Sequence, residues 1–267
     1  MDINFLQYAF IQKAFLAGSF IAVTCAALGM FLVLRKMSLI SDGLSHVSFG
    51  AIALGLFLGV YPYYAAVPLV MAASYLILKI TEKAKVYGDA AIGIVSAVGI
   101  AGGVILASLS KGFNVDLFSY LFGNILSIST TEVVLSVLLS FVVLAVLWFY
   151  YWDLFSATFD QNYARTTGVK TNMINIILTL LTSLVVVLSV KVVGVLLVSA
   201  LMILPAAGAL QLAKGFRSAI LVGCCFSLVS VLTGITFSFF LDLPTGATIV
   251  MINAIIFAIA LIYKKIA

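Results

Sequence analysis

Long apolar stretches alternate with short polar breaks along the whole chain. Nine such stretches stand out: 14–34, 39–59, 65–80, 91–109, 133–151, 173–190, 192–204, 219–241 and 247–263. A helix needs about 20 apolar residues to cross the hydrocarbon core of a bilayer, so only the run 192–204 is clearly short. The pattern predicts an all-α polytopic membrane protein with eight or nine transmembrane helices, forming a single domain over residues 1–267.

Three interruptions depart from this simple alternation. Segment 110–129 holds two short apolar pieces broken by Gly, Asn and Asp, and we expect a short helix packed at the outer surface or dipping partly inward. Segment 152–172 is the longest hydrophilic stretch. Pro205 follows the short apolar run, and because proline removes a helical hydrogen bond, we expect it to break or bend that helix.

Composition and charge fit a membrane protein and set its orientation. The chain is 64% hydrophobic and 9% charged, so its net charge of +5 is no sign of nucleic-acid binding. With nine crossings and the N-terminus outside, only Lys13, Lys111 and Lys191 of the 14 basic residues lie outside. Cytoplasmic loops carry an excess of Lys and Arg, so this asymmetry predicts an outside N-terminus and an inside C-terminus.

The second apolar stretch carries the candidate chemistry. Asp42 and His46, the only histidine, are four residues apart and therefore share one helix face. Ser38 and Ser45 extend this polar stripe as possible pathway-lining residues. Ionisable groups inside membrane helices are costly and mark substrate or ion pathways. We interpret Asp42 and His46 as ligands for a divalent metal ion in transit.

Other interpretations of this pair remain open on the residues alone. Asp42 lies near a helix end and could extend its carboxylate to the headgroups, and His46 could be structural. A hydrolase using Ser41, Asp42 and His46 lacks an evident oxyanion hole. The chain contains no GxxxxGK[ST], HExxH or GxSxG motif, so ATP binding through a P-loop and two familiar hydrolytic sites are excluded.

The stretch RKMSLISDGLSHVSFGAIALG (35–55) resembles the permease subunits of ATP-binding-cassette importers for zinc and manganese. It has their basic pair, then M-S-L and D-x-x-S-H. Three further stretches resemble the same family in order: DLFSYLFGNILSIS (116–129), VGVLLVSALMILPAAGALQLA (193–213) and DLPTGATIVMINAIIF (242–257). The resemblance therefore extends over nearly the whole chain.

The resemblance implies a transport subunit rather than an enzyme, in the plasma membrane of a bacterium. It implies a homodimer with the pathway at the subunit interface, a separate cytoplasmic ATPase subunit and an extracytoplasmic metal-binding protein. The family's metal ligands correspond to Asp42 and His46. No permanently bound cofactor is expected, and the ion is cargo. The Asp/His pair suits both zinc and manganese, and the overall resemblance slightly favours zinc.

Two polar segments are candidates for the ATPase contact. The favoured segment, 205–217, is expected to form a short surface helix between two glycines; its contact residues would be Pro205, Gly208, Gln211, Lys214, Gly215 and Arg217. The alternative is 160–168. A secondary metal transporter or channel, which would need no ATPase, remains the main rival function. A membrane enzyme would have only Asp42, His46 and scattered serines to work with.

Overall fold

The computed structural model describes residues 7–83, 87–109, 115–124, 128–195 and 197–266, and every regular element in these ranges is a helix. Eight helices are long and apolar enough to cross a membrane: α1 (Ala9–Leu34), α2 (Leu39–Phe57), α3 (Pro62–Lys83), α4 (Gly88–Leu109), α6 (Thr130–Phe149), α9 (Thr171–Val193), α11 (Phe216–Leu241) and α12 (Thr245–Ile266). The predicted all-α polytopic class is thus confirmed.

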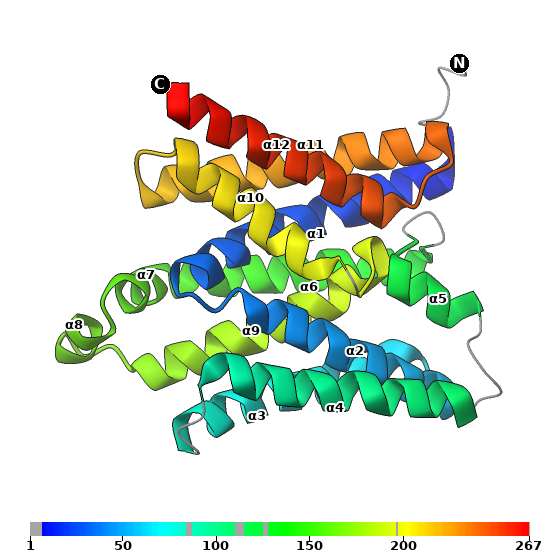
Figure 1. Ribbon diagram of the computed structural model, residues 1–267, viewed down its shortest axis with the longest axis horizontal. Coiled ribbons are helices and arrows are strands. Elements are labelled where there is room, and N and C mark those ends of the chain that lie inside the picture. The colour runs from blue at the N-terminus through cyan, green and yellow to red at the C-terminus, as the bar shows by residue number, and fades with distance from the viewer. Residues whose placement is uncertain (1–6, 84–86, 110–114, 125–127, 196, 267) are drawn as a thin grey trace.

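Four shorter helices lie between these spans: α5 (Val115–Phe122), α7 (Tyr151–Phe159), α8 (Gln161–Thr166) and α10 (Val198–Leu212). The expected short helix in segment 110–129 is α5, while 110–114 and 125–127 fall outside the described residues. Helices α7 and α8 occupy most of the polar segment 152–172 and project at one end of the bundle (Figure 1).

The doubtful seventh stretch is a short helix displaced from its predicted bounds. Helix α9 ends at Val193, and α10 begins only at Val198. Figure 1 shows α9 and α11 running in the same direction, with α10 carrying the chain back between them. The start of α1 and the end of α12 lie at opposite ends of the bundle.

The break between α9 and α10 depends on two glycines with positive φ. Gly194 has φ 92° and Gly123 has φ 74°. A Cβ on Gly123 would lie 2.6 Å from the backbone nitrogen of Gly194, so the two backbones approach too closely for a side chain. Val195 donates its N–H to the carbonyl of Tyr120, and Asn124 donates to that of Lys191. This contact holds the end of α5 against the end of α9.

One prediction about α10 is wrong. Pro205 does not end the helix, which continues to Leu212, so no separate surface helix forms between Gly208 and Gly215. Pro205 removes one backbone hydrogen bond, a loss that membrane helices tolerate when their neighbours enclose the site. Here Ala206 and Ala209 are fully buried and pack in one cluster with Met30 of α1.

Candidate metal pathway

Helix α2 holds the predicted ligand pair near one end. Asp42 lies in its first turn and His46 one turn further on. At a rise of about 1.5 Å per residue, His46 lies about 10 Å along a helix of about 28 Å. It is therefore within the membrane-spanning length of α2, on the side where the α1–α2 turn carries Arg35 and Lys36.

The two side chains face each other. His46 Nε2 lies 3.8 Å from Asp42 Oδ2. Ligand atoms that each lie about 2.1 Å from a zinc ion are at most about 4.2 Å apart, so both could bind one ion without moving. The side chain of Asp42 is 46% exposed and that of His46 is 23% exposed. An ion could thus reach the carboxylate from outside this subunit.

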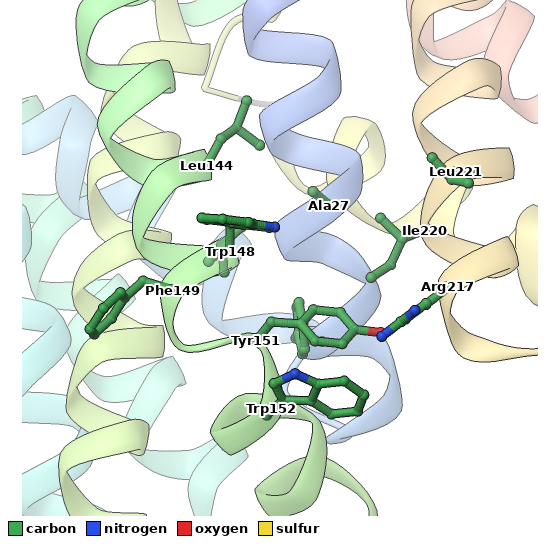
Figure 2. Close-up of a pocket in the computed structure, with 11 residues that line it drawn as sticks. Ala27, Leu144, Trp148, Phe149, Tyr151, Trp152, Arg217, Ile220 and Leu221 are labelled. Carbon is green, nitrogen blue, oxygen red and sulfur yellow. The ribbon is translucent and has the colours of Figure 1, made fainter.

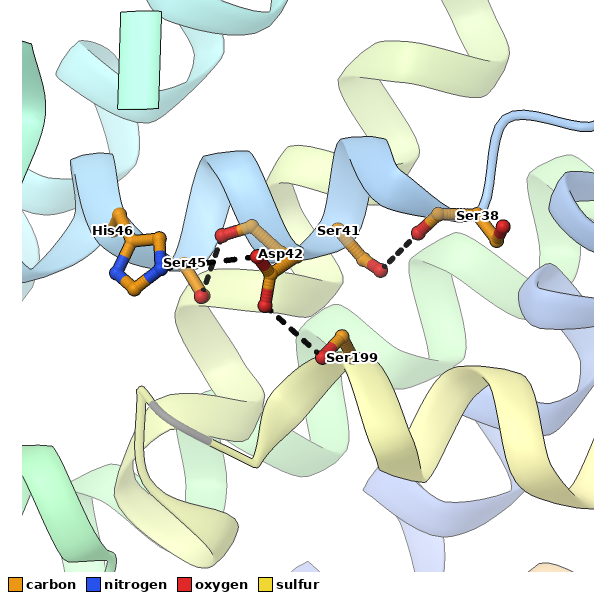
Figure 3. A network of polar contacts seen from close by, with 6 residues as sticks. All are labelled: Ser38, Ser41, Asp42, Ser45, His46 and Ser199. Atoms are coloured by element: carbon orange, nitrogen blue, oxygen red, sulfur yellow. Dashed lines mark hydrogen bonds and ion pairs between the residues drawn. The ribbon is translucent and has the colours of Figure 1, made fainter. Parts of the chain in front are cut away.

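A residue absent from the sequence prediction holds the carboxylate in place. Ser199, in the first turn of α10, donates its hydroxyl to Asp42 Oδ1 at 3.2 Å (Figure 3). Outer-sphere hydrogen bonds of this kind orient metal-ligating carboxylates. No local spacing in the sequence relates Ser199 to Asp42; only the location of VSA within the resembling stretch 193–213 marked its neighbourhood.

The predicted serines lie on the same stripe but serve the helix backbone. Ser45 donates to the main-chain carbonyl of Asp42 at 2.7 Å, and Ser38 accepts through its carbonyl from Ser41 at 2.8 Å (Figure 3). Within the described part of the chain, the buried Nδ1 of His46 has no hydrogen-bond partner. An unpaired buried polar atom is costly, which is consistent with a partner supplied from elsewhere.

The Asp42/His46 pair has no third His, Cys, Asp or Glu ligand beside it in the part of the chain that the structure describes. Among the described residues, no group of three or more His, Cys, Asp or Glu side chains is arranged to hold an ion. The pair therefore offers two protein ligands, whereas closed metal sites in proteins commonly use four.

Close helix packing fixes the position of α2. Gly99 of α4 lies against the backbone of Val47, and a Cβ there would be 2.7 Å from Val47 Cα. A Cβ on Gly50 of α2 would lie even closer to the Gly99 carbonyl oxygen. Small residues let membrane helices approach in this way, because lipid supplies no hydrophobic force between them. Val47 follows His46 in the chain, so this contact with α4 fixes the part of α2 that carries the imidazole.

The six residues predicted for the ATPase contact differ in how far they are buried. Pro205 and Gly208 are buried inside α10. Gln211 is half-buried and accepts a hydrogen bond from Lys264. Lys214, Gly215 and Arg217 are exposed. The alternative segment forms α8, capped by Asp160 through the N–H groups of Asn162 and Tyr163, and only Ala164 in this helix is buried.

Comparisons with known proteins agree on one kind of protein. The profile of the ABC 3 transport family matches residues 7–264. The manganese transport system membrane protein MntC of Halalkalibacterium halodurans is 32% identical over 259 residues, covering 97% of this chain and 89% of that protein. The high-affinity zinc uptake system membrane protein ZnuB of Haemophilus influenzae is 32% identical over 259 residues, covering 97% and 99%.

Solved structures share the fold. PsaBC from Streptococcus pneumoniae, solved in complex with Fab, is similar with a TM-score of 0.88 and 30% identity, covering 97% of this chain and 93% of that chain. An inward-facing structure of a putative metal-chelate type ABC transporter has a TM-score of 0.77 at 15% identity, covering 94% and 85%. At that lower identity the likeness concerns the fold alone.

Proposed function

This chain belongs to the ABC 3 transport family, and from that premise we propose that it is the permease subunit of an importer that moves zinc or manganese into the bacterial cytoplasm. Relatives of equal identity are named for manganese and for zinc, which supports a divalent metal ion as cargo and leaves both ions as candidates. Eight helices are long and apolar enough to cross a membrane, and the family makes the chain a multi-pass protein of the bacterial plasma membrane.

The observation that carries the proposal is the 3.8 Å approach of His46 Nε2 to Asp42 Oδ2 inside a membrane span. Intramembrane ionisable pairs mark ion pathways. We propose that two copies of the chain form a homodimer and that each contributes this pair, giving four protein ligands at the interface. The exposure of Asp42 supports this, because the carboxylate is accessible from beyond its own subunit.

The ligand set suits transit rather than storage. A neutral imidazole and a carboxylate bind zinc well and manganese acceptably. A pathway site must be strong enough for the ion to enter and weak enough for it to leave. Two half-exposed pairs contributed by different subunits could separate as the subunits move, which would lower the affinity and release the ion. The imidazole ligands favour zinc slightly over manganese.

We propose that a separate cytoplasmic ATPase drives transport and binds at the end formed by α7, α8 and the α10–α11 turn. The aromatic side chains of Tyr163 and Phe159 are 62% and 60% exposed at this end. Lys214 and Gly215 extend the same end. Because burial removes Pro205 and Gly208 from any surface, α8 becomes the main contact candidate and Lys214 its flank. An extracytoplasmic metal-binding protein would deliver ions at the opposite end.

The rival function is an ATP-independent secondary transporter or channel using the same pair. The test is uptake of radioactive zinc or manganese into proteoliposomes that hold this chain together with its co-purified ATPase. Our proposal predicts uptake only when ATP is present on the side of the membrane where the ATPase lies. Equal uptake without ATP, driven by an imposed ion gradient, would favour the rival. Competition between the two ions in the same assay identifies the preferred cargo.

The docking site has its own test. Single cysteines at Tyr163 and Lys214 are crosslinked to the ATPase in membranes, with Tyr64 at the opposite end of the bundle as the control position. Strong crosslinking at Tyr163 supports α8 as the contact. Crosslinking at Lys214 alone would return the contact to the segment 205–217, and crosslinking at neither would contradict docking at this end.

A further inference from the structure

An apolar groove of about 670 Å³ lies between α1, α6 and α11, on elements that the proposed metal pathway does not use. Its wall combines aliphatic and aromatic side chains with a single cation (Figure 2). The residues that carry the argument are Leu144, Trp148, Tyr151, Trp152, Arg217 and Leu221.

The groove opens toward the surroundings of the bundle. Trp148 is 83% exposed and Leu221 is 67% exposed. Both belong to helices long and apolar enough to span a membrane, so at this depth their exposed apolar surfaces suit contact with lipid. The lining includes Leu144 and Trp148 of α6 and Trp152 of α7, so it continues past the end of α6. The groove thus runs from the end of a span into its apolar length.

Arg217 lies at the outer rim, in the first turn of α11. Its guanidinium carbon is 5.1 Å from the ring centre of Trp152 and 5.7 Å from that of Tyr151. Within the described ranges, no carboxylate lies within ion-pair distance of this guanidinium. Contact with the ring faces holds the guanidinium in place and leaves N–H groups to donate in its own plane.

The backbone adds to the positive charge at this rim. Helix α11 starts at Phe216, and its N-cap residue is Gly215, which has no side chain to accept from the first-turn N–H groups. The first N–H groups of a helix and its dipole favour an anion. Tryptophan and tyrosine are typical of the boundary between hydrocarbon and headgroups. The rim thus suits an anion at headgroup depth.

We propose that this groove binds a phospholipid with an anionic headgroup, whose phosphate interacts with Arg217 and whose acyl chain lies along Trp148, Leu221 and Leu144. A lipid accounts for both parts of the site, because a free anion would leave the apolar wall unused. Leu144 lies about 7.5 Å inside the end of α6, at a depth that a lipid acyl chain reaches and a partner confined to water does not.

The test measures lipid binding to the purified transporter after its native lipids are removed by detergent exchange. Phosphatidylglycerol and phosphatidylcholine are titrated separately and followed by native mass spectrometry. We expect tighter binding of phosphatidylglycerol, and an affinity for it about fivefold weaker in Arg217→Gln. Lys214→Gln, which removes a nearby exposed cation outside the groove, should leave the affinity unchanged. Equal binding of the two lipids by the wild type, or unaltered binding by Arg217→Gln, would overturn the proposal.

Two further measurements cover the apolar wall and the identity of the anion. Trp148→Ala changes a largely exposed side chain and is expected to fold. It should lower the affinity for both lipids while keeping the preference for phosphatidylglycerol. Unchanged binding in this variant would contradict the proposed acyl-chain position. Excess inorganic phosphate should not displace phosphatidylglycerol, and complete displacement would show that the site recognises a free anion instead.

Discussion

Ser199 of α10 donates a hydrogen bond to Asp42 of α2 across 157 positions of sequence, with an oxygen–oxygen distance of 3.2 Å. The bond joins the beginning of the displaced seventh helix to the proposed metal ligand (Figure 3). Because α10 begins only after the break at Gly194, the same break that shortens this helix also places Ser199 beside the carboxylate.

Replacing this serine should weaken metal binding without abolishing it. Ser199→Ala removes one hydrogen bond to the carboxylate, and loss of such outer-sphere bonds commonly lowers metal affinity about tenfold or more. We expect the metal concentration that gives half-maximal uptake to rise about tenfold, measured with radioactive metal at limiting concentrations. Ser183→Ala is the matched control, because Ser183 bonds only the carbonyl of Leu180 in its own helix. Identical uptake in both variants would show that Ser199 does not position Asp42.

A single methyl group on α4 should disturb the site from outside. Gly99→Ala places a Cβ against the backbone of Val47, which cannot yield as a flexible side chain would. Overpacking of this kind costs about 1–3 kcal/mol. Gly102→Ala is the control on the same helix, since a Cβ there meets nothing within 4 Å. We expect a lower melting temperature and reduced uptake for Gly99→Ala only; equal melting temperatures would contradict the close α2–α4 contact.

A buried ion pair stabilises the other end of the bundle. Glu132 Oε1 lies 3.7 Å from Lys191 Nζ, and both side chains are almost fully buried. Glu132 also completes a capping box with Ser129 at the start of α6, and Lys191 lies over the ring of Tyr120. The pair thus joins α6 to the end of α9 and to α5.

Breaking this pair should be strongly destabilising. Lys191→Met leaves the Glu132 carboxylate buried without its cation, at a cost of about 3–5 kcal/mol. We expect a clear fall in melting temperature of the detergent-solubilised protein, and a smaller fall for the double variant Glu132→Gln, Lys191→Met. Lys265→Met, at the exposed end of α12, serves as the control. The single variant Glu132→Gln completes the comparison. If the loss of stability in the double variant equals the sum of the losses in the two single variants, the two residues are not coupled.

Hydropathy predicted the membrane spans well because a bilayer requires long apolar helices wherever the chain crosses. The four-residue spacing predicted the approach of Asp42 and His46, since i and i+4 side chains meet on any helix. These are local consequences of helix geometry. The all-α polytopic class could therefore be predicted from local sequence patterns alone.

Features set by contacts between distant segments were missed. Pro205 is a helix breaker by local rules, yet α10 continues past it because Ala206 and Ala209 are enclosed by neighbouring helices. Ser199 lies beside Asp42 although 157 positions separate them, and the close backbone approach of Gly123 and Gly194 lies just before the helix that carries Ser199. The apolar run 192–204 gave no indication that its first two residues belong to α9, which ends at Val193. Neither spacing nor propensity encodes such contacts.

The predicted orientation is tested by labelling from outside the cell. Tyr263→Cys lies near the end of α12 and Tyr64→Cys at the opposite end of the bundle, and both positions are exposed. Cys224 and Cys225 are first changed to serine. A membrane-impermeant thiol reagent should label Tyr64→Cys on intact cells and label Tyr263→Cys only after lysis. Labelling of Tyr263→Cys on intact cells would show that the orientation is reversed or that α10 does not cross.

The assignment of Asp42 and His46 as metal ligands is the central claim, and equilibrium metal binding to the purified transporter tests it most directly. Asp42→Ala, His46→Ala and the control Ser41→Ala are compared, since Ser41 lies on the same helix but bonds only the Ser38 carbonyl. Bound zinc and manganese are counted per chain after dialysis, with melting temperatures measured in parallel. We expect the control to bind like the wild type and both ligand variants to lose binding and uptake while remaining folded. Wild-type metal content in folded Asp42→Ala and His46→Ala proteins would contradict the assignment.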